Sequence, residues 1–214
     1  MKYYPVNLNI AGKKVLVVGG GAVAARKVER LLEREADITL VAPIISSEIK
    51  KLVAQNMIEW IERTYKSGDE QGSFAVFCAV SAGEENLKME SGLFKRCVKK
   101  NILINVADKP DFCTFTLPAL VSRGEFDIAV FTSGLSPRLA KKIREDLEKV
   151  YGEEYNTYVK ILGFIRKEIK LKKYPQSRNQ ELFDELINSD LFELVRDKRF
   201  SDVSLFISNF IKRA

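Results

Sequence analysis

Histidine is absent from the 214 residues of this chain. Its absence excludes serine–histidine–aspartate and cysteine–histidine catalysis, imidazole metal ligands and the most common general base. Any proton transfer must therefore rely on aspartate, glutamate, tyrosine, lysine or cysteine.

Cysteine is scarce. The three cysteines, Cys78, Cys97 and Cys113, are odd in number and show no C-x-x-C spacing. Disulfides and thiolate metal sites are therefore not expected, and we predict a cytoplasmic protein with no bound metal.

Long hydrophobic runs are also missing. No apolar stretch approaches the ~20 residues of a membrane span, and the N-terminal segment lacks the apolar core of a signal peptide. The net charge of +6 suits either a solvated surface or a polyanionic partner. No basic cluster carries interleaved aromatic residues. We therefore expect neither nucleic acid nor a membrane as a partner.

The chain does contain a glycine-rich loop between a strand and a helix. Residues 15–18 (VLVV) have the length and β-branching of a buried strand, and residues 19–21 (GGG) follow at once. Gly19, Gly21 and Ala24 fit the dinucleotide pattern G-x-G-x-x-A. The first glycine permits the tight turn, the second lets a pyrophosphate approach, and the alanine lets the helix pack closely. The alternative is a tight turn that holds no ligand.

We predict a dinucleotide bound at this loop. The start of the helix, at Ala22 and Val23, offers free N–H groups to the phosphates. The next predicted strand, at 37–41, is followed by neither an acid for a ribose hydroxyl nor an arginine for a 2′-phosphate. Ribose contacts are therefore assigned to backbone groups near Ala42, Pro43 and Ile44, and NAD is favoured over NADP.

Strands and helices alternate along the first half of the chain. The patterns predict strands at 15–18, 36–41, 58–61, 74–80 and 102–106, and helices at 22–35, 46–56 and 84–100. This alternation is typical of an α/β fold with a Rossmann-like, doubly wound parallel sheet.

The regular alternation of predicted strands and helices ends after Asp108. Residues 114–121 are apolar and irregular, 126–131 alternate like a strand, and a basic helix is expected at 138–149. This section is too small for a core of its own, so it must pack on the first domain or on a second chain. From residue 155 onward the pattern is helical.

Four motifs in this order resemble the precorrin-2 dehydrogenases, which are NAD-dependent enzymes of siroheme synthesis. They lie at 15–32, 41–43, 105–124 and 133–145. The resemblance implies an NAD-binding Rossmann domain at 1–112, a small dimerisation segment at 113–147 and a helical C-terminal domain at 148–214. It also implies a homodimer that oxidises precorrin-2, a tetrapyrrole, to sirohydrochlorin while NAD⁺ accepts a hydride.

Asp108 is the candidate catalytic residue. It follows the fifth predicted strand, at the edge where open α/β sheets bind ligands, and no histidine competes for the role of base. It also matches the family's Asn-Val-x-Asp aspartate, which the resemblance makes catalytic. The alternative is an aspartate that only starts a turn or caps a helix. Asp111 is a weaker candidate.

The substrate of this family carries carboxylates, which basic side chains would bind through charge-assisted contacts. Lys109, Arg123 and Arg138 lie in the matching motifs, although each also fits an exposed, solvated side chain. Ser136 precedes a predicted helix whose N–H groups would suit an anion. It is equally explained as an N-cap followed by Pro137.

Two other functions remain open at this point. Some family members also insert iron into the product, so a bifunctional dehydrogenase and ferrochelatase is one alternative. Residues 79–82 (AVSA) differ from the Ala-Thr-Asp-Asp common in the family. A non-catalytic module that binds a dinucleotide or a tetrapyrrole is therefore the other.

Overall fold

The structure is a computed structural model that describes residues 3–213. The chain forms two compact units, Met1–Leu117 and Pro118–Ala214. The domain boundaries expected at residues 112 and 147 stay predictions.

The first unit is built on a five-stranded parallel sheet with the strand order β3-β2-β1-β4-β5. The strands are β1 (Lys14–Val18), β2 (Asp37–Val41), β3 (Glu59–Ile61), β4 (Ala75–Cys78) and β5 (Leu103–Val106). The strand order reverses between β1 and β4, which pair in parallel from Val15 with Ala75 to Val18 with Cys78. Ligands of open α/β sheets bind at the carboxyl ends of the strands at such a switch point.

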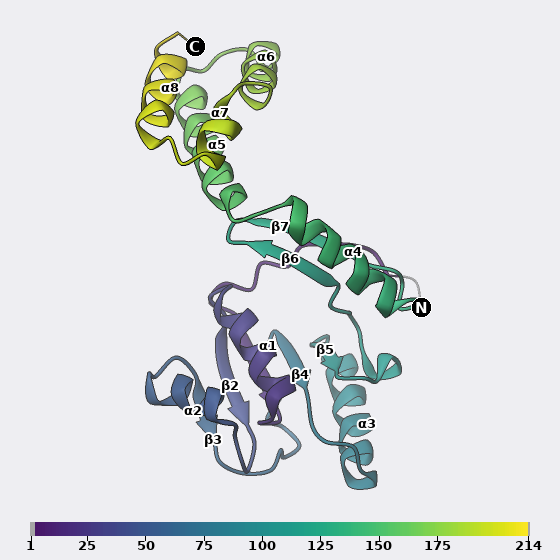
Figure 1. Cartoon of the computed structure of the whole chain (residues 1–214). Coiled ribbons are helices and arrows are strands. Elements are labelled where there is room, and N and C mark those ends of the chain that lie inside the picture. The colour runs from purple at the N-terminus through teal and green to yellow at the C-terminus, as the bar shows by residue number, and fades with distance from the viewer. Residues whose placement is uncertain (1–2, 214) are drawn as a thin grey trace. The chain divides into compact units, whose positions relative to one another are not determined.

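Three helices cover the two faces of this sheet (Figure 1): α1 (Ala22–Leu32), α2 (Ser47–Ala54) and α3 (Glu84–Lys99). The apolar residues of α1 and α2, such as Val28 and Ile49, pack with Val17 and Phe77 on one face. On the other face, Leu93 of α3 packs with Val76 of β4. The α/β class and the doubly wound parallel sheet are thereby confirmed.

The second unit begins with an antiparallel hairpin of β6 (Ala119–Arg123) and β7 (Phe126–Val130), followed by α4 (Pro137–Val150). Four further helices follow: α5 (Glu154–Leu171), α6 (Gln176–Ile187), α7 (Leu191–Arg196) and α8 (Phe200–Arg213). Their shared core includes Ile165, Leu186 and Leu191, none of which is exposed. Among residues 3–213, no helix is long and apolar enough to cross a membrane.

The largest differences from the expected elements lie at two places, and the other bounds agree to within two residues. Strand β6 lies in a stretch expected to be irregular, because Pro118 directly precedes it and its sequence does not alternate. Helix α1 ends at Leu32, three residues earlier than expected. The chain then turns through Glu35 in the left-handed region, with φ of 57°.

Candidate active site

The glycine loop after β1 is held between the ends of two neighbouring strands. Gly19 has φ of +116°, and a Cβ atom there would lie 2.2 Å from the carbonyl oxygen of Ala79. A Cβ atom on Gly20 would lie 2.1 Å from the carbonyl oxygen of Ile44. The Gly19 amide donates to the Val41 carbonyl at 3.0 Å. Both positions therefore require glycine, and the sequence pattern assigned no role to Gly20.

Gly21 differs from its two neighbours because it faces open space. A Cβ atom there would meet nothing within 4 Å. Gly21 is the N-cap of α1 and has no side chain to cap the helix, and no acidic residue lies in the first turn. The positive end of the helix at Ala22 and Val23 is therefore not neutralised locally. This arrangement fits an anionic diphosphate, and the fully buried Ala24 lets α1 pack against the sheet.

The segment after β2 has fewer free backbone groups than the sequence suggested. The Ala42 carbonyl accepts a hydrogen bond from Trp60 Nε1 at 2.9 Å, and the Ala42 amide donates to the Ile61 carbonyl at 3.3 Å. Pro43 and Ile44 are exposed. A ribose contact at this segment would therefore fall to Pro43 and Ile44 more readily than to the Ala42 backbone.

Asp108 lies at the same edge of the sheet as the glycine loop. It is exposed in a turn directly after β5 and has φ of 58°, in the left-handed region. The preceding Ala107 amide donates to the Cys78 carbonyl at 2.8 Å, so the turn is joined to the end of β4. Two strand spacings of ~4.8 Å, across β4, separate the ends of β1 and β5. Asp111 is also exposed, within the short 3₁₀ helix Pro110–Phe112 (η1).

Lys109 anchors this turn to α3. Its ammonium group pairs with the carboxylate of Glu90, whose side chain is only 3% exposed. A buried carboxylate requires such a partner because desolvation of an unpaired charge is costly. Lys109, which directly follows Asp108, therefore already has a partner for its charge. Binding of a substrate carboxylate by Lys109 stays a prediction.

A second contact reaches the same segment from α1, on the other face of the sheet. Lys27 Nζ donates to Asn105 Oδ1 at 2.9 Å and lies 5.4 Å from the centre of the Phe77 ring. Asn105 Nδ2 donates to the Phe115 carbonyl at 3.1 Å. Sequence analysis did not select Lys27, although a lysine among the buried α1 positions 24, 28 and 31 was a visible signal.

The thiol of Cys113 packs under this turn. It accepts a hydrogen bond from the Val106 amide at 3.2 Å and lies 3.3 Å from the Lys109 carbonyl oxygen. Burial raises the pKa of this thiol. Cys113 is therefore a packed, neutral group that shapes the turn, as its buried position in the η1 region indicates.

The remaining basic candidates differ in their contacts. Arg123 donates to the carbonyl oxygens of Tyr151 at 3.0 Å and Glu148 at 3.4 Å, and it pairs with Glu153 at 3.3 Å. It therefore ties β6 to the end of α4. Arg138 is exposed and has no ion-pair partner within residues 3–213.

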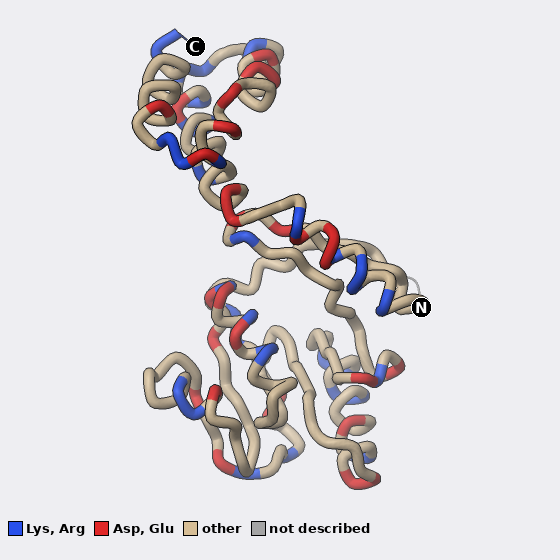
Figure 2. The backbone as a smooth tube through the Cα atoms, in the orientation of Figure 1, with Lys and Arg blue, Asp and Glu red and all other residues tan. Residues whose placement is uncertain are grey.

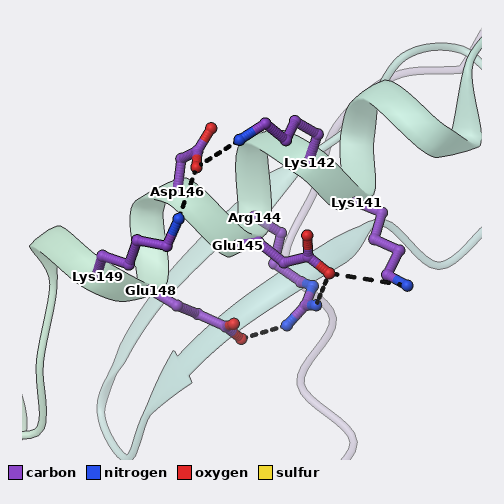
Figure 3. A network of polar contacts seen from close by, with 7 residues as sticks. All are labelled: Lys141, Lys142, Arg144, Glu145, Asp146, Glu148 and Lys149. Carbon is purple, nitrogen blue, oxygen red and sulfur yellow. Dashed lines mark hydrogen bonds and ion pairs between the residues drawn. The ribbon is translucent and has the colours of Figure 1, made fainter.

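The other basic residues of α4 are engaged on their own helix. Both signs of charge are mixed along α4 (Figure 2), and acids and bases pair at a spacing of three or four residues. The network of Figure 3 consists of Lys141, Lys142, Arg144, Glu145, Asp146, Glu148 and Lys149. Arg138, one turn before this network, is thus the basic candidate most available to an anionic ligand.

Ser136 acts as an N-cap. Its hydroxyl accepts a hydrogen bond from the Leu139 amide at 3.3 Å, and Pro137 occupies the first helical position of α4. The capping alternative is therefore present in the structure, and binding of the substrate by Ser136 stays a prediction.

A further buried charged cluster lies away from this site. Glu70, whose side chain is not exposed, precedes β4 and pairs with Arg96 at 3.2 Å. Burial alone would raise the pKa of Glu70, but the hydrogen bond from Tyr65 and the positive charge of Arg96 lower it overall. The Gly68 amide also donates to Glu70 at 2.9 Å. The Glu70 carboxylate is therefore fully paired, and we assign this cluster a structural role in holding the loop before β4.

Comparison with known proteins gives a consistent result. A family model for NAD(P)-binding domains matches residues 6–119. The precorrin-2 dehydrogenase of Priestia megaterium is 34% identical over 198 residues, which cover 92% of this chain and 96% of that protein. The siroheme synthase of Neisseria meningitidis serogroup C (strain 053442) is 32% identical over 199 residues, and the match covers 93% of this chain but 41% of the synthase.

Solved structures point the same way. The structure of SirC, a precorrin-2 dehydrogenase, matches with a TM-score of 0.76 and 29% sequence identity. The match covers 99% of this chain and 100% of that one.

Proposed function

We propose that this chain, which belongs to the precorrin-2 dehydrogenase family, oxidises precorrin-2 to sirohydrochlorin with NAD⁺ as the hydride acceptor. The observation that carries the proposal is the shared edge of the sheet, where an uncapped helix start and a carboxylate lie on either side of β4. This edge is the ligand-binding side of a doubly wound sheet.

The cofactor would be held mainly by backbone groups. The amides at Gly21, Ala22 and Val23 would bind the diphosphate, since Gly21 is open and the start of α1 is uncapped. Gly19 would contribute by forming the tight turn, because its own amide already donates to the Val41 carbonyl. Pro43 and Ile44 would contact the ribose. Ala42, whose amide and carbonyl are hydrogen-bonded within the protein, would support this segment. No arginine follows β2 to bind a 2′-phosphate, which favours NAD over NADP. When bound, the nicotinamide supplies the hydride acceptor.

Asp108 would accept the proton. The oxidation removes a hydride and a proton from the substrate, and the chain has no histidine to act as base. Asp108 is exposed at the carboxyl end of β5 and is free to reach a bound molecule. The left-handed turn that carries Asp108 is held on both sides, by the contact of Lys27 with Asn105 and by the ion pair of Lys109 with Glu90.

The substrate carboxylates would be met by basic groups. Arg138 supports this role best, because it is exposed and has no acidic partner in the described part of the chain. Lys109, Arg123 and Ser136 are retained as weaker candidates, since each already has a partner within the protein.

We also propose a homodimer located in the cytoplasm. The β6–β7 hairpin with α4 is small, and it exposes apolar side chains at Phe131, Leu135, Leu139 and Ile143. A two-stranded hairpin needs further packing to be stable, and a second copy would supply it. Light scattering should then give twice the chain mass, whereas a monomer at micromolar concentration would contradict the dimer. Three free, buried cysteines suit a reducing compartment.

The test of the activity is direct. Purified protein mixed with freshly prepared precorrin-2 and NAD⁺ should produce NADH and sirohydrochlorin in equal amounts. A known precorrin-2 dehydrogenase assayed in parallel shows that the substrate is intact. Absence of NADH from this chain, with the parallel assay active, would overturn the proposed function.

A further inference from the structure

Lys27 extends its charged end toward the interior of the first unit and not toward solvent. It lies on α1 among the positions that face the sheet, and its side chain passes the Phe77 ring to reach Asn105 on β5. A partly buried ammonium group loses hydration, which costs free energy unless partners replace the water. A methionine would fill the same space without this cost.

The contact of Lys27 fixes an amide that has only one possible orientation. Asn105 is 8% exposed, and its Oδ1 accepts from Lys27, which can only donate. Its Nδ2 donates to the Phe115 carbonyl at 3.1 Å. Lys27 therefore joins the helix of the glycine loop to the strand that leads, three residues later, to Asp108.

The charge environment of Lys27 includes the candidate base. Burial is the largest cause of a pKa below the ordinary value for lysine. Repulsion from Arg30 and Arg26, on the same helix, lowers the pKa further. Attraction from the Asp108 carboxylate opposes this change, as does attraction from Cys113 at a pH where its thiol is ionised. Asp108 is therefore one of the charged groups that influence the pKa of Lys27.

We propose that Lys27 is a positioning residue for the oxidation, an inference that rests on the proposed function. Its ammonium group holds the Asn105 amide, and with it the turn that carries Asp108. The nucleotide-binding helix and the base are thereby coupled through one side chain.

The activity test compares three variants. Lys27→Met keeps the length of the side chain and removes its charge, Lys27→Arg keeps the charge, and Lys99→Met alters an exposed lysine of α3 as a matched control. We expect kcat of Lys27→Met to fall roughly 10- to 100-fold, as for the loss of a charge-assisted hydrogen bond. Thermal stability should change little, because removal of a partly buried charge offsets the loss of the hydrogen bond to Asn105 Oδ1. KM for NAD⁺ should not change, Lys27→Arg should recover part of kcat, and Lys99→Met should match the parent protein.

The pH profile provides a readout that a purely structural role would not affect. Activity of the parent protein should decline as pH rises through the lowered pKa of Lys27, because the ammonium group loses its charge. This decline should be absent in Lys27→Met and should move to higher pH in Lys27→Arg. Equal kcat and an identical pH profile in Lys27→Met and the parent protein would overturn the inference.

A measurement without turnover separates this inference from the proposed function. The titration of Lys27 can be followed by NMR of ¹³Cε-labelled lysine, with Lys27→Arg used to assign the signal. We expect a pKa below that of ordinary lysines, lowered further in Asp108→Asn, because the attraction from the carboxylate is lost. If Lys27 titrates as an ordinary lysine and Asp108→Asn has no effect, the inference fails even in an active enzyme. If no NADH forms, the proposed function fails, and the titration still decides whether Lys27 and Asp108 are coupled.

Discussion

The glycine loop and the turn that carries Asp108 lie at the same edge of one sheet, but they are built by different means. The loop is shaped by the absence of side chains, since Cβ atoms at Gly19 and Gly20 would strike the carbonyl oxygens of Ala79 and Ile44. The turn is shaped by side chains that arrive from both helical layers, Lys27 from α1 and Glu90 from α3.

This difference has a consequence for how each region fails. A site built from backbone groups tolerates changes nearby but no added Cβ atom at Gly19 or Gly20. A turn held by charged side chains depends on each partner, because removing one leaves the other buried without compensation. The following variants test whether the two regions fail in these separate ways.

The largest effect is expected at Asp108. Asp108→Asn should lower kcat roughly 100- to 10,000-fold, the usual contribution of a general base. NAD⁺ should bind as before, because the glycine loop is unchanged. Rates of NADH formation and a calorimetric titration with NAD⁺ measure the two quantities. Asp111→Asn, three residues further on, is the matched control, and a loss of activity in this variant alone would show that the base has been assigned wrongly.

Lys109→Met should lower the stability of the protein, because the turn loses its anchor to α3. It leaves the Glu90 carboxylate buried without its partner, so the free energy of unfolding should fall by about 3 kcal/mol. Urea denaturation measures this change. The double variant Lys109→Met with Glu90→Gln should regain part of the loss, since no buried charge remains. A loss below about 0.5 kcal/mol, as for an exposed pair, would contradict the anchoring role.

Substitutions at the two ends of the glycine loop should have different effects, on stability at Gly19 and on NAD⁺ binding at Gly21. Gly19→Ala should lower the free energy of unfolding by roughly 1–3 kcal/mol, because alanine is strained at φ of +116° and its Cβ meets a carbonyl. Gly21→Ala should change it by less than about 1 kcal/mol, since the position is open, but should weaken binding of NAD⁺. Equal binding of NAD⁺ by Gly21→Ala and the parent protein would indicate that no phosphate approaches there.

The smallest effect is expected outside both regions, at Ser136. Ser136→Ala removes the N-cap of α4 and should cost about 1 kcal/mol of stability. Ser136→Thr, which keeps a hydroxyl, is the control. If Ser136→Ala instead raises KM for precorrin-2 without affecting stability, the serine belongs to the substrate site and not only to the cap.

The sequence predicted the sheet well because its elements are local. The strands of the first unit are short and largely apolar, and the glycine pattern lies within six residues, 19–24. The α/β class and the five parallel strands were confirmed for this reason. Strand β6 was missed because its residues follow Pro118 and do not alternate, so pairing with β7 decides its conformation.

The side-chain contacts that hold the Asp108 turn could not be predicted in the same way. Lys27 and Asn105 are 78 residues apart, and Lys109 and Glu90 are 19 residues apart, so only the folded chain brings them together. Lys109 and Arg123 looked like exposed cations in the sequence, and both prove to be engaged within the protein. The need for glycine at position 20 likewise depends on Ile44, which lies in the loop after β2.

The central claim is that the glycine loop and the Asp108 turn serve one bound dinucleotide. Titration of ¹⁵N-labelled protein with NAD⁺, followed by amide NMR, tests it most directly. We predict the largest shifts at residues 19–23 and at residues 107–109, saturating together at one NAD⁺ per chain. Shifts confined to other parts of the chain, with both of these segments unchanged, would contradict the account.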